Sequence, residues 1–398
     1  MKKLISNPNF IYIASFLVPF LFYSFGWSNL YPKLGTSLFL FYLFTFFICF
    51  ILGALIHFVK PFHFTTVPVS KWNGLIILFI YFFYFIEGLY SRKIPLIGFI
   101  NGTYDYNEDT FGIGAIHTFV DTFDTFYCVY IFHQYLSSKK KSLLFLIFLC
   151  LFPFIILVYR ANILNVLLGC FSVFMLSRKS MSLKIIFKSI IGITLILYLF
   201  GFMGNIRSAH GDSTVIPRAS EATEEFMNGP VPNEFYWSYL YIASPVANLQ
   251  NNIHYTTNPN GDAVGFFMHE CLPNFVIKLL QMPGIEFYQI NPFLNVGTIY
   301  VYSYSYLGWV GTIFLFIYFI AFINLYYLVL QLSDTYKVAG MAMLYNVIIF
   351  ANFHNTIAYS GSSTQLVYPV IFSIITEKVI RRNNFKSLKT NNLSVNVV

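Results

Sequence analysis

Ten apolar stretches, most of them close to 20 residues long, run through this sequence and constrain its fold more than any other feature. A helix needs roughly 20 mainly apolar residues to cross the hydrocarbon part of a bilayer. The stretches lie at about residues 10–27, 36–58, 73–91, 112–136, 143–159, 161–177, 184–203, 305–331, 338–353 and 363–380. They predict an all-α polytopic membrane protein with about ten transmembrane helices.

Lysine and arginine are distributed unequally among the segments that join these stretches. If the N-terminus is cytoplasmic, 17 of the 24 Lys and Arg residues fall on the cytoplasmic side, among them Lys139–Lys141 and the tail from Arg381 onwards. The other 7 fall outside, and several of them lie in one long loop, where the positive-inside rule has little force. We therefore expect both termini to be cytoplasmic.

One long stretch, residues 204–295, is polar. It holds 8 of the chain's 16 acidic residues, and in this orientation it lies outside the membrane, in the periplasm of a Gram-negative cell. The chain then divides into spans one to seven at 1–203, this loop, spans eight to ten within 296–382 and a cytoplasmic tail at 383–398. We interpret the loop as a lid over a cavity that opens to the periplasm.

Composition and motifs exclude several classes of protein. Only 10% of the residues are charged, whereas a soluble protein has about a quarter. No GxxxxGK[ST] loop is present, so the chain encodes no ATP-driven pump. The five cysteines lack CxxC spacing and the histidines match no zinc motif, so we expect neither a metal nor a cofactor. The net charge of +8 reflects membrane topology and does not indicate a nucleic-acid partner.

Three arginines on the external side are candidates for binding an anion. Arg160 lies between the fifth and sixth stretches, Arg207 directly follows the seventh, and Arg218 comes eleven residues later. A guanidinium group offers a planar fork that suits phosphate oxygens, and an arginine near the membrane needs water or a counter-ion. We expect a phosphate or pyrophosphate site at these residues. The alternative is that they are interfacial or solvated arginines of no special role.

A second set of polar residues lies inside the fourth stretch. His117, Asp121 and Asp124 follow the spacing HxxxDxxD, which places all three on one face of a helix. Carboxylates inside a span indicate a functional site, because they are costly in the membrane. They could line a polar cavity, hold a cation, relay protons or bind sugar hydroxyls. The alternative is a structural face that partners such as Arg160 neutralise, and Glu87 could join it.

The candidates for proton transfer are His254, His269, Glu270 and His354, and the last three are preferred. His269 and Glu270 lie in the apolar sequence GFFMHECLPN, where burial could change the pKa of either group. His354 lies at the external end of the ninth stretch. The alternative is a structural role for each.

Four short patterns accompany this layout. They are Arg160 with residues 162–167 at the start of a span, GNIR at 204–207, YIASPVANL at 241–249, and NVGT at 295–298 followed by YLGWVG at 306–311. With about ten spans, both ends inside and one large external loop, the chain resembles the Wzy-type O-antigen polymerases, which join oligosaccharide repeat units at bacterial surfaces. The resemblance covers most of the chain. A second arginine-rich external loop, found in some members, is not evident here.

The resemblance implies a GT-C-like membrane glycosyltransferase in the bacterial inner membrane. It would transfer the growing glycan from undecaprenyl pyrophosphate to the next lipid-linked repeat unit, at the periplasmic face. Arg160 and Arg207, and more weakly Arg218, would neutralise the departing pyrophosphate, while His269, Glu270 or His354 would act near the acceptor hydroxyl. The implied partners are the lipid-linked oligosaccharide, membrane lipid and a protein that regulates chain length.

Two other classes of function stay open. An O-antigen ligase has a similar layout but transfers the finished glycan to the lipid A core. A flippase or other transporter of lipid-linked oligosaccharides would use the His117 face as a proton or sodium relay, although such transporters generally lack a long external loop and show internal repeats.

Overall fold

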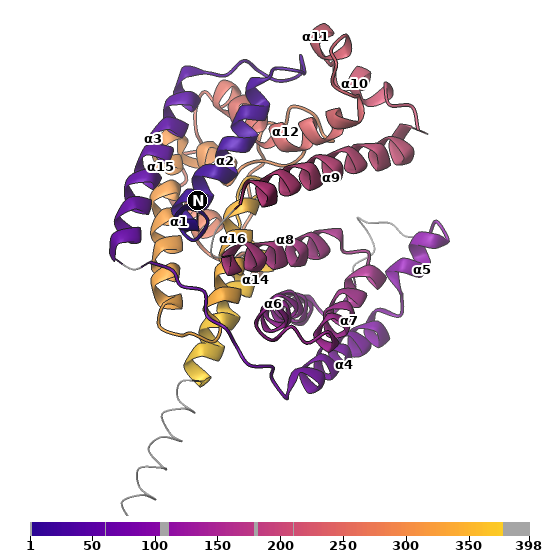
Figure 1. The fold of residues 1–398 in the computed structure, drawn as a ribbon. Coiled ribbons are helices and arrows are strands. Elements are labelled where there is room, and N and C mark those ends of the chain that lie inside the picture. The colour runs from indigo at the N-terminus through magenta and orange to yellow at the C-terminus, as the bar shows by residue number, and fades with distance from the viewer. Residues whose placement is uncertain (1, 60, 104–110, 179–181, 210, 377–398) are drawn as a thin grey trace, which may run out of the picture. The chain divides into compact units, whose positions relative to one another are not determined.

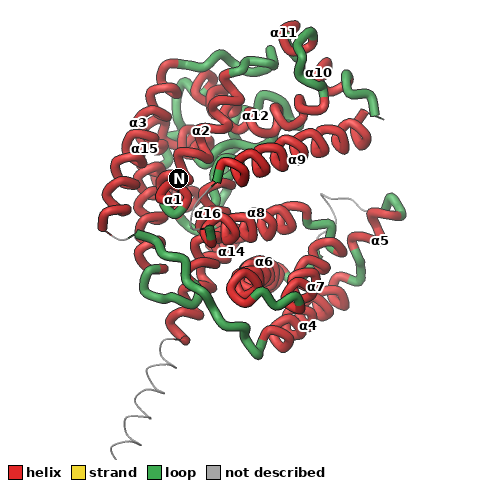
Figure 2. Tube along the Cα trace, in the orientation of Figure 1, coloured by secondary structure: helices red, strands yellow, loops and turns green. Residues whose placement is uncertain are grey.

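Helices make up most of the chain in the ranges that the computed structural model describes, which are residues 2–59, 61–103, 111–178, 182–209 and 211–376. Figure 2 shows no strand in these ranges, and one isolated antiparallel bridge pairs Ser28 with Ala222. The expected tail at 383–398 lies outside the described residues.

The helices follow one another with short connections in most places (Figure 1). In chain order they are α1 (Lys2–Ile5), α2 (Pro8–Ser24), α3 (Thr36–Val59), α4 (Asn73–Ser91), α5 (Pro95–Ile100), α6 (Gly114–Ser138), α7 (Ser142–Ile156), α8 (Arg160–Ser177), α9 (Leu183–Ala209), α10 (Val215–Ala219), α11 (Glu224–Met227), α12 (Glu234–Tyr255), α13 (Ala263–Phe266), the π-helix η1 (Phe267–Cys271), α14 (Asn274–Leu280), α15 (Tyr300–Leu330), α16 (Lys337–Phe350), α17 (Ser360–Ser363) and the 3₁₀-helix η2 (Thr364–Leu366). Residues 367–376 are helical as well.

Five helices are long and apolar enough to cross a membrane, and they contain Thr36–Ile56, Asn73–Ser91, Arg160–Ser177, Phe187–Ile206 and Tyr300–Leu330. Their outer faces carry large apolar side chains such as Phe47, which is 63% exposed, and Leu78, which is 65% exposed. Such faces suit lipid, because a soluble protein rarely exposes large apolar patches. A helical, membrane-embedded protein is therefore confirmed.

The other expected spans also fall on helices. Three of these helices, α2, α7 and α16, are apolar but shorter than 18 residues, and α6 carries polar residues. The count of about ten spans and the periplasmic side of residues 204–295 therefore stay predictions.

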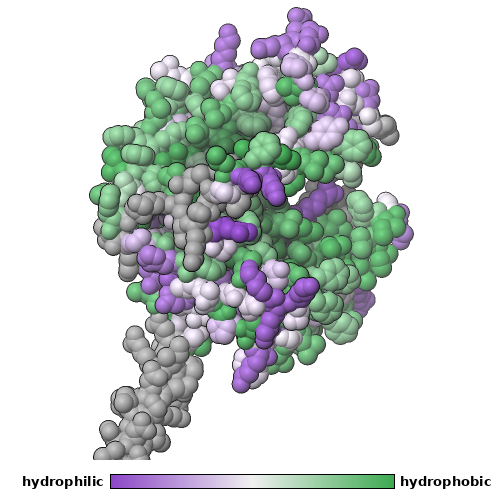
Figure 3. Space-filling view, viewed as in Figure 1, coloured by the Kyte–Doolittle hydropathy of each residue, from purple (hydrophilic) through white to green (hydrophobic). Residues whose placement is uncertain are grey.

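The chain forms two compact units, and each is described by itself. The first contains residues 1–61, 178–322 and 347–359. Within it, α12 packs against α9 and α2, and α2 packs against α3. Residues 204–295 thus contribute a 22-residue helix to this unit as well as shorter elements. Hydrophilic side chains gather over α10 and α11 in Figure 3, where the three glutamates 221, 224 and 225 are exposed.

The aromatic residues at the start of α12 are part of the core. Tyr236 and Tyr239 are fully buried. The Tyr239 hydroxyl accepts a hydrogen bond from the backbone N–H of Trp27 at 3.0 Å, and the Tyr236 ring lies 4.7 Å from that of Phe226. These contacts bury the two tyrosines within the first unit.

Helices α9 and α12 approach each other closely at Gly201. A Cβ atom at this position would lie 1.7 Å from the carbonyl oxygen of Glu234. On either side, Ser238 Oγ donates to the Leu197 carbonyl at 2.9 Å and Trp237 Nε1 donates to Asn205 Oδ1 at 2.8 Å. A small residue at the contact is typical of helices that pack in membranes.

The second unit contains residues 62–177, 323–346 and those from 360 onwards. Its centre is α6, which is seen end-on in Figure 1 and packs against α4, α7 and α8. Thirteen residues of α6 are buried, among them Asp121, Asp124, His133 and Gln134. The neighbouring helices α4, α7 and α8 surround α6, because polar side chains inside an apolar protein need hydrogen-bonding partners.

Candidate functional site

The first candidate site lies in the polar stretch, on the π-helix η1. Asp262 caps the preceding helix α13, with its side chain accepting a hydrogen bond from the N–H of Gly265 at 2.8 Å. The chain then widens into the π-helix Phe267–Cys271, which carries His269 and Glu270. Single π-turns are rare and occur frequently at functional sites.

Glu270 is held by one asparagine from a distant part of the chain. Its side chain is buried, and its Oε2 atom accepts a hydrogen bond from Asn355 Nδ2 at 3.0 Å. The same amide donates to the Glu270 carbonyl at 2.8 Å. Burial raises the pKa of Glu270 from 4.5 to about 7, against the opposing effect of the Asn355 hydrogen bond. At neutral pH this carboxyl can therefore both accept and donate a proton, as a general acid–base requires.

The two histidines differ from Glu270 in their surroundings. The ring of His269 stacks on that of Tyr306, with centroids 6.0 Å apart, and the buried Nε2 atom has no hydrogen-bond partner among the described residues. His354 directly precedes Asn355, and its ring meets Tyr359 edge-on at 5.1 Å. Burial lowers the pKa of His354 to about 4, so the ring is neutral at pH 7 and binds a proton weakly. Glu270 is therefore a better proton acceptor than His354. We define the Glu270 site as Glu270, His269, Asn355 and Tyr306.

The second candidate site lies in the other unit, on α6. His117 stands between two carboxyl groups: its Nδ1 atom lies 2.8 Å from Glu87 Oε2 and its Nε2 atom lies 3.2 Å from Asp121 Oδ2. Nε2 also lies 3.0 Å from the Tyr159 hydroxyl. Glu87 comes from α4 and is fully buried. The spacing HxxxD on α6 therefore places His117 and Asp121 in direct contact, and α4 supplies the second acid.

Tyr84 joins this group to Asp124. Its hydroxyl lies 2.9 Å from Asp121 Oδ1 and 3.4 Å from Asp124 Oδ2. Asn162 of α8 donates to Asp121 Oδ2 at 3.3 Å. Asp124 is fully buried. We define the α6 cluster as His117, Asp121, Asp124, Glu87 and Tyr84.

The structure describes the side chains of two of the three expected arginines, Arg160 and Arg218, and both are exposed. Arg160, the first residue of α8, is exposed and forms no ion pair within the described ranges, so it does not neutralise Asp121. Arg218 on α10 is exposed, and its charge lowers the pKa of Asp212 slightly, after the hydrogen bonds from Thr214. The backbone of Arg207 belongs to α9, but its side chain lies outside the described residues. A role for these arginines in binding pyrophosphate stays a prediction.

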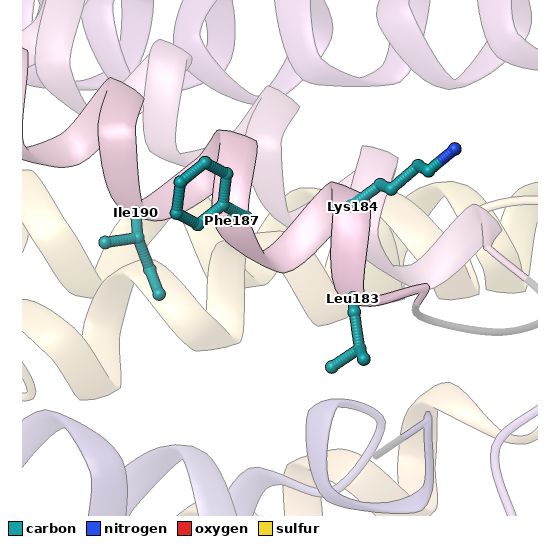
Figure 4. A pocket seen from close by; sticks show the side chains of 4 residues that line it. All are labelled: Leu183, Lys184, Phe187 and Ile190. Carbon is teal, nitrogen blue, oxygen red and sulfur yellow. The ribbon is translucent and has the colours of Figure 1, made fainter.

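A shallow hollow on α9 contains none of these groups. Leu183, Lys184, Phe187 and Ile190 line it, and Figure 4 shows all four side chains projecting from one helix. All four are exposed. Because a single helix face lines the hollow, it does not enclose a ligand.

The sequence alone did not identify three residues that hydrogen-bond the site carboxyls, namely Asn355, Tyr84 and Asn162. Asn355 was not identified, although it lies next to His354, because an asparagine in a loop carries no signal of its distant partner. Tyr84 and Asn162 were missed for the same reason. Glu87 could be noticed as the one acid in an apolar stretch, but its contact with His117 could not be derived.

No group of His, Cys, Asp and Glu side chains within the described ranges could hold a metal ion. No family model matches the chain, and comparisons with curated proteins and with solved structures find no significant match.

Proposed function

We propose that this protein polymerises lipid-linked O-antigen repeat units at the periplasmic face of the bacterial inner membrane. It would transfer the growing glycan from undecaprenyl pyrophosphate to the next lipid-linked repeat unit. The observation that carries the proposal is Glu270: a buried carboxyl with a pKa of about 7, fixed by Asn355, in the polar stretch between the membrane helices α9 and α15. The layout of apolar helices around one long polar stretch supports it as well.

In the proposed reaction Glu270 removes the proton from the acceptor hydroxyl of the incoming sugar. The hydroxyl oxygen forms a bond to the anomeric carbon of the growing glycan, and the bond from that carbon to the pyrophosphate breaks. The pyrophosphate leaves with the bonding electrons, and Arg160, Arg207 and Arg218 are the cations assigned to it. A positioned base contributes typically 10²–10⁴-fold to such a rate, and cations stabilise a departing anion.

Deletion of the gene, followed by a gel of the lipopolysaccharide, tests the reaction class. Loss of the ladder with retention of core plus one repeat unit supports a polymerase. Complementation with Glu270→Gln should leave the one-repeat pattern, because an amide cannot accept the proton. Glu286→Gln is the matched control, since Glu286 is an exposed carboxyl in the same stretch. A wild-type ladder from Glu270→Gln, at equal amounts of protein in the membrane, would contradict the role of Glu270.

Arg160→Ala and Arg207→Ala test the cation assignment separately. Each should shorten or abolish the ladder, because the leaving group loses a positive charge. Wild-type ladders from both variants would exclude these arginines and leave the proposal for Glu270 standing.

One observation favours a second function, that of a flippase or transporter of lipid-linked oligosaccharides. The α6 cluster holds five titratable groups, each in contact with at least one other, and such groups often relay protons in transporters. Complete loss of O-antigen in the deletion strain would favour this function or a ligase. Lipid-linked repeat units that accumulate on the cytoplasmic face indicate a flippase, and finished lipid-linked polymer on the periplasmic face indicates a ligase.

A further inference from the structure

A continuous line of hydrogen-bonding groups follows one face of α6. Hydrogen bonds of the Tyr84 hydroxyl join Asp124 to Asp121. The last link is an ion-pair contact of 3.2 Å between Asp121 Oδ2 and His117 Nε2. The far end is bounded by Glu87 and Tyr159. Asp124 has no exposed surface, whereas the side chains of His117 and Asp121 are 14% and 11% exposed. The line therefore joins the interior of the second unit to its surface.

The number of protons on this line can be derived from its geometry. A phenol hydroxyl carries one proton, so Tyr84 can donate to Asp121 or to Asp124 but not to both. If both acids were ionised, one of them would face a lone pair of the Tyr84 oxygen, and the two like charges would repel in a buried setting. Asp124 is the more deeply buried of the two acids. A proton on Asp124 would relieve the repulsion, and Oδ2 would then donate to the Tyr84 oxygen, which lies 3.4 Å away, while Tyr84 donates to Asp121.

We propose that this line is a proton wire, with Asp124 as its internal proton-binding site and His117 as its exchange point at the surface. Asp124 gives its proton to the Tyr84 oxygen as Tyr84 gives its own to Asp121 Oδ1. The Asp121 carboxyl turns about its Cβ–Cγ bond and gives that proton to His117 Nε2. The products are an Asp124 carboxylate and a His117 imidazolium, so one O–H bond has broken, one N–H bond has formed and the net charge is unchanged.

Groups from α4, α7, α8 and the helix at residues 367–376 face the wire. Glu87 of α4 accepts from His117 Nδ1 and stabilises the imidazolium that forms. The Cys150 thiol of α7 lies beside Asp124, and Tyr81 of α4 lies close to the same carboxyl. Tyr368 faces Asp121 from the helix at residues 367–376. Asn162 of α8 donates to Asp121 and holds the carboxyl in line.

Infrared spectroscopy of the full-length protein in liposomes at pH 8 tests the wire. A protonated carboxyl gives a C=O band that carboxylates lack, and this band shifts when its proton is exchanged for deuterium. We expect such a band in the wild type and not in Asp124→Asn. Tyr84→Phe should keep the band but slow its exchange in D₂O at least tenfold. Tyr81→Phe is the matched control, because this hydroxyl lies on the same helix and donates to the Leu149 carbonyl.

Three results would overturn the proposal. The first is an Asp124→Asn spectrum identical to that of the wild type, which means that Asp124 is ionised. The second is equal exchange rates in Tyr84→Phe and Tyr81→Phe. The third is loss of the band on addition of NaCl but not KCl, which assigns the site to a sodium ion. If Asp124→Asn does not fold, the exchange rates of the two tyrosine variants decide alone. The test does not depend on the proposed function, since it leaves Glu270 unchanged.

Discussion

Burial and one hydrogen bond together set the pKa of Glu270. Burial raises this pKa, the Asn355 amide lowers it by donating to the carboxylate, and the result is a value of about 7. Since a general base must be ionised, polymer formation should rise with pH and be half-maximal near pH 7.

Asn355→Ala should move this half-maximal point to higher pH, because the variant loses the interaction that lowers the Glu270 pKa. Polymer formation from lipid-linked repeat units, measured across pH for wild type and variant, checks the shift. Asn291→Ala is a suitable control, because the Asn291 side chain accepts a hydrogen bond from the N–H of Phe293 in the same loop. A uniform loss of activity with no shift in the profile would show that Asn355 acts only on local structure.

The raised pKa of Glu270 also makes stability depend on pH. Between about pH 4.5 and 7 the folded protein holds a proton on Glu270 that the unfolded chain releases, so stability falls as pH rises through this window. The loss amounts to at most about 3 kcal/mol, because the pKa differs by about 2.5 between the two states.

Glu270→Gln should remove this loss. The change in melting temperature from pH 5 to pH 8 should be more favourable in Glu270→Gln than in the wild type. Thermal unfolding in detergent at both pH values measures the gain, with Glu286→Gln as the exposed control. Parallel behaviour of Glu270→Gln and wild type at the two pH values would show that Glu270 titrates normally.

At the scale of elements, the close contact of α9 and α12 depends on one glycine. A Cβ atom on Gly201 would lie 1.7 Å from a backbone oxygen of α12, which cannot move without shifting the helix. Gly201→Ala should therefore separate the two helices and lower the melting temperature. Gly192→Ala on the same helix is the control, since a Cβ there meets nothing within 4 Å and alanine favours a helix by about 1 kcal/mol. Equal melting temperatures for the two variants would contradict the contact.

Contacts between residues close in the sequence could be predicted, whereas contacts between residues far apart could not. His117 and Asp121 could be placed together from their separation of four residues, because a helix repeats every 3.6 residues. The Asn355–Glu270 contact joins residues 85 apart, and no local pattern reports it. The buried helix α12 was also hard to foresee. Its Asn248, Asn251 and Asn252 look like loop residues, yet they are buried and bond the backbone of the segment that follows α14.

At the scale of the whole molecule, the apolar helices are compatible with two membrane topologies, which differ in the number of helices that cross. In the first topology all ten expected spans cross the membrane. Three crossings, α7, α8 and α9, then lie between residues 140 and 258, so these two residues are on opposite sides of the membrane. In the second topology only the five long apolar helices cross. Two crossings, α8 and α9, then lie between residues 140 and 258, so these two residues are on the same side of the membrane. The difference depends on α7, whose 15 residues span about 22 Å of a hydrocarbon layer about 30 Å thick.

Cysteine labelling from one side of the membrane decides between these topologies. Lys140 and Asn258 are both exposed, and four of the five natural cysteines are buried, so Lys140→Cys and Asn258→Cys can be labelled above a low background. We expect a membrane-impermeant thiol reagent to label Asn258→Cys in intact spheroplasts and Lys140→Cys only after lysis, because the membrane can thin locally around a short helix at modest cost. Labelling of both residues from one side would show that α7 does not cross. It would also place residues 204–295 on the same side as Lys139–Lys141, and a periplasmic role for Glu270 would then conflict with the positive-inside rule.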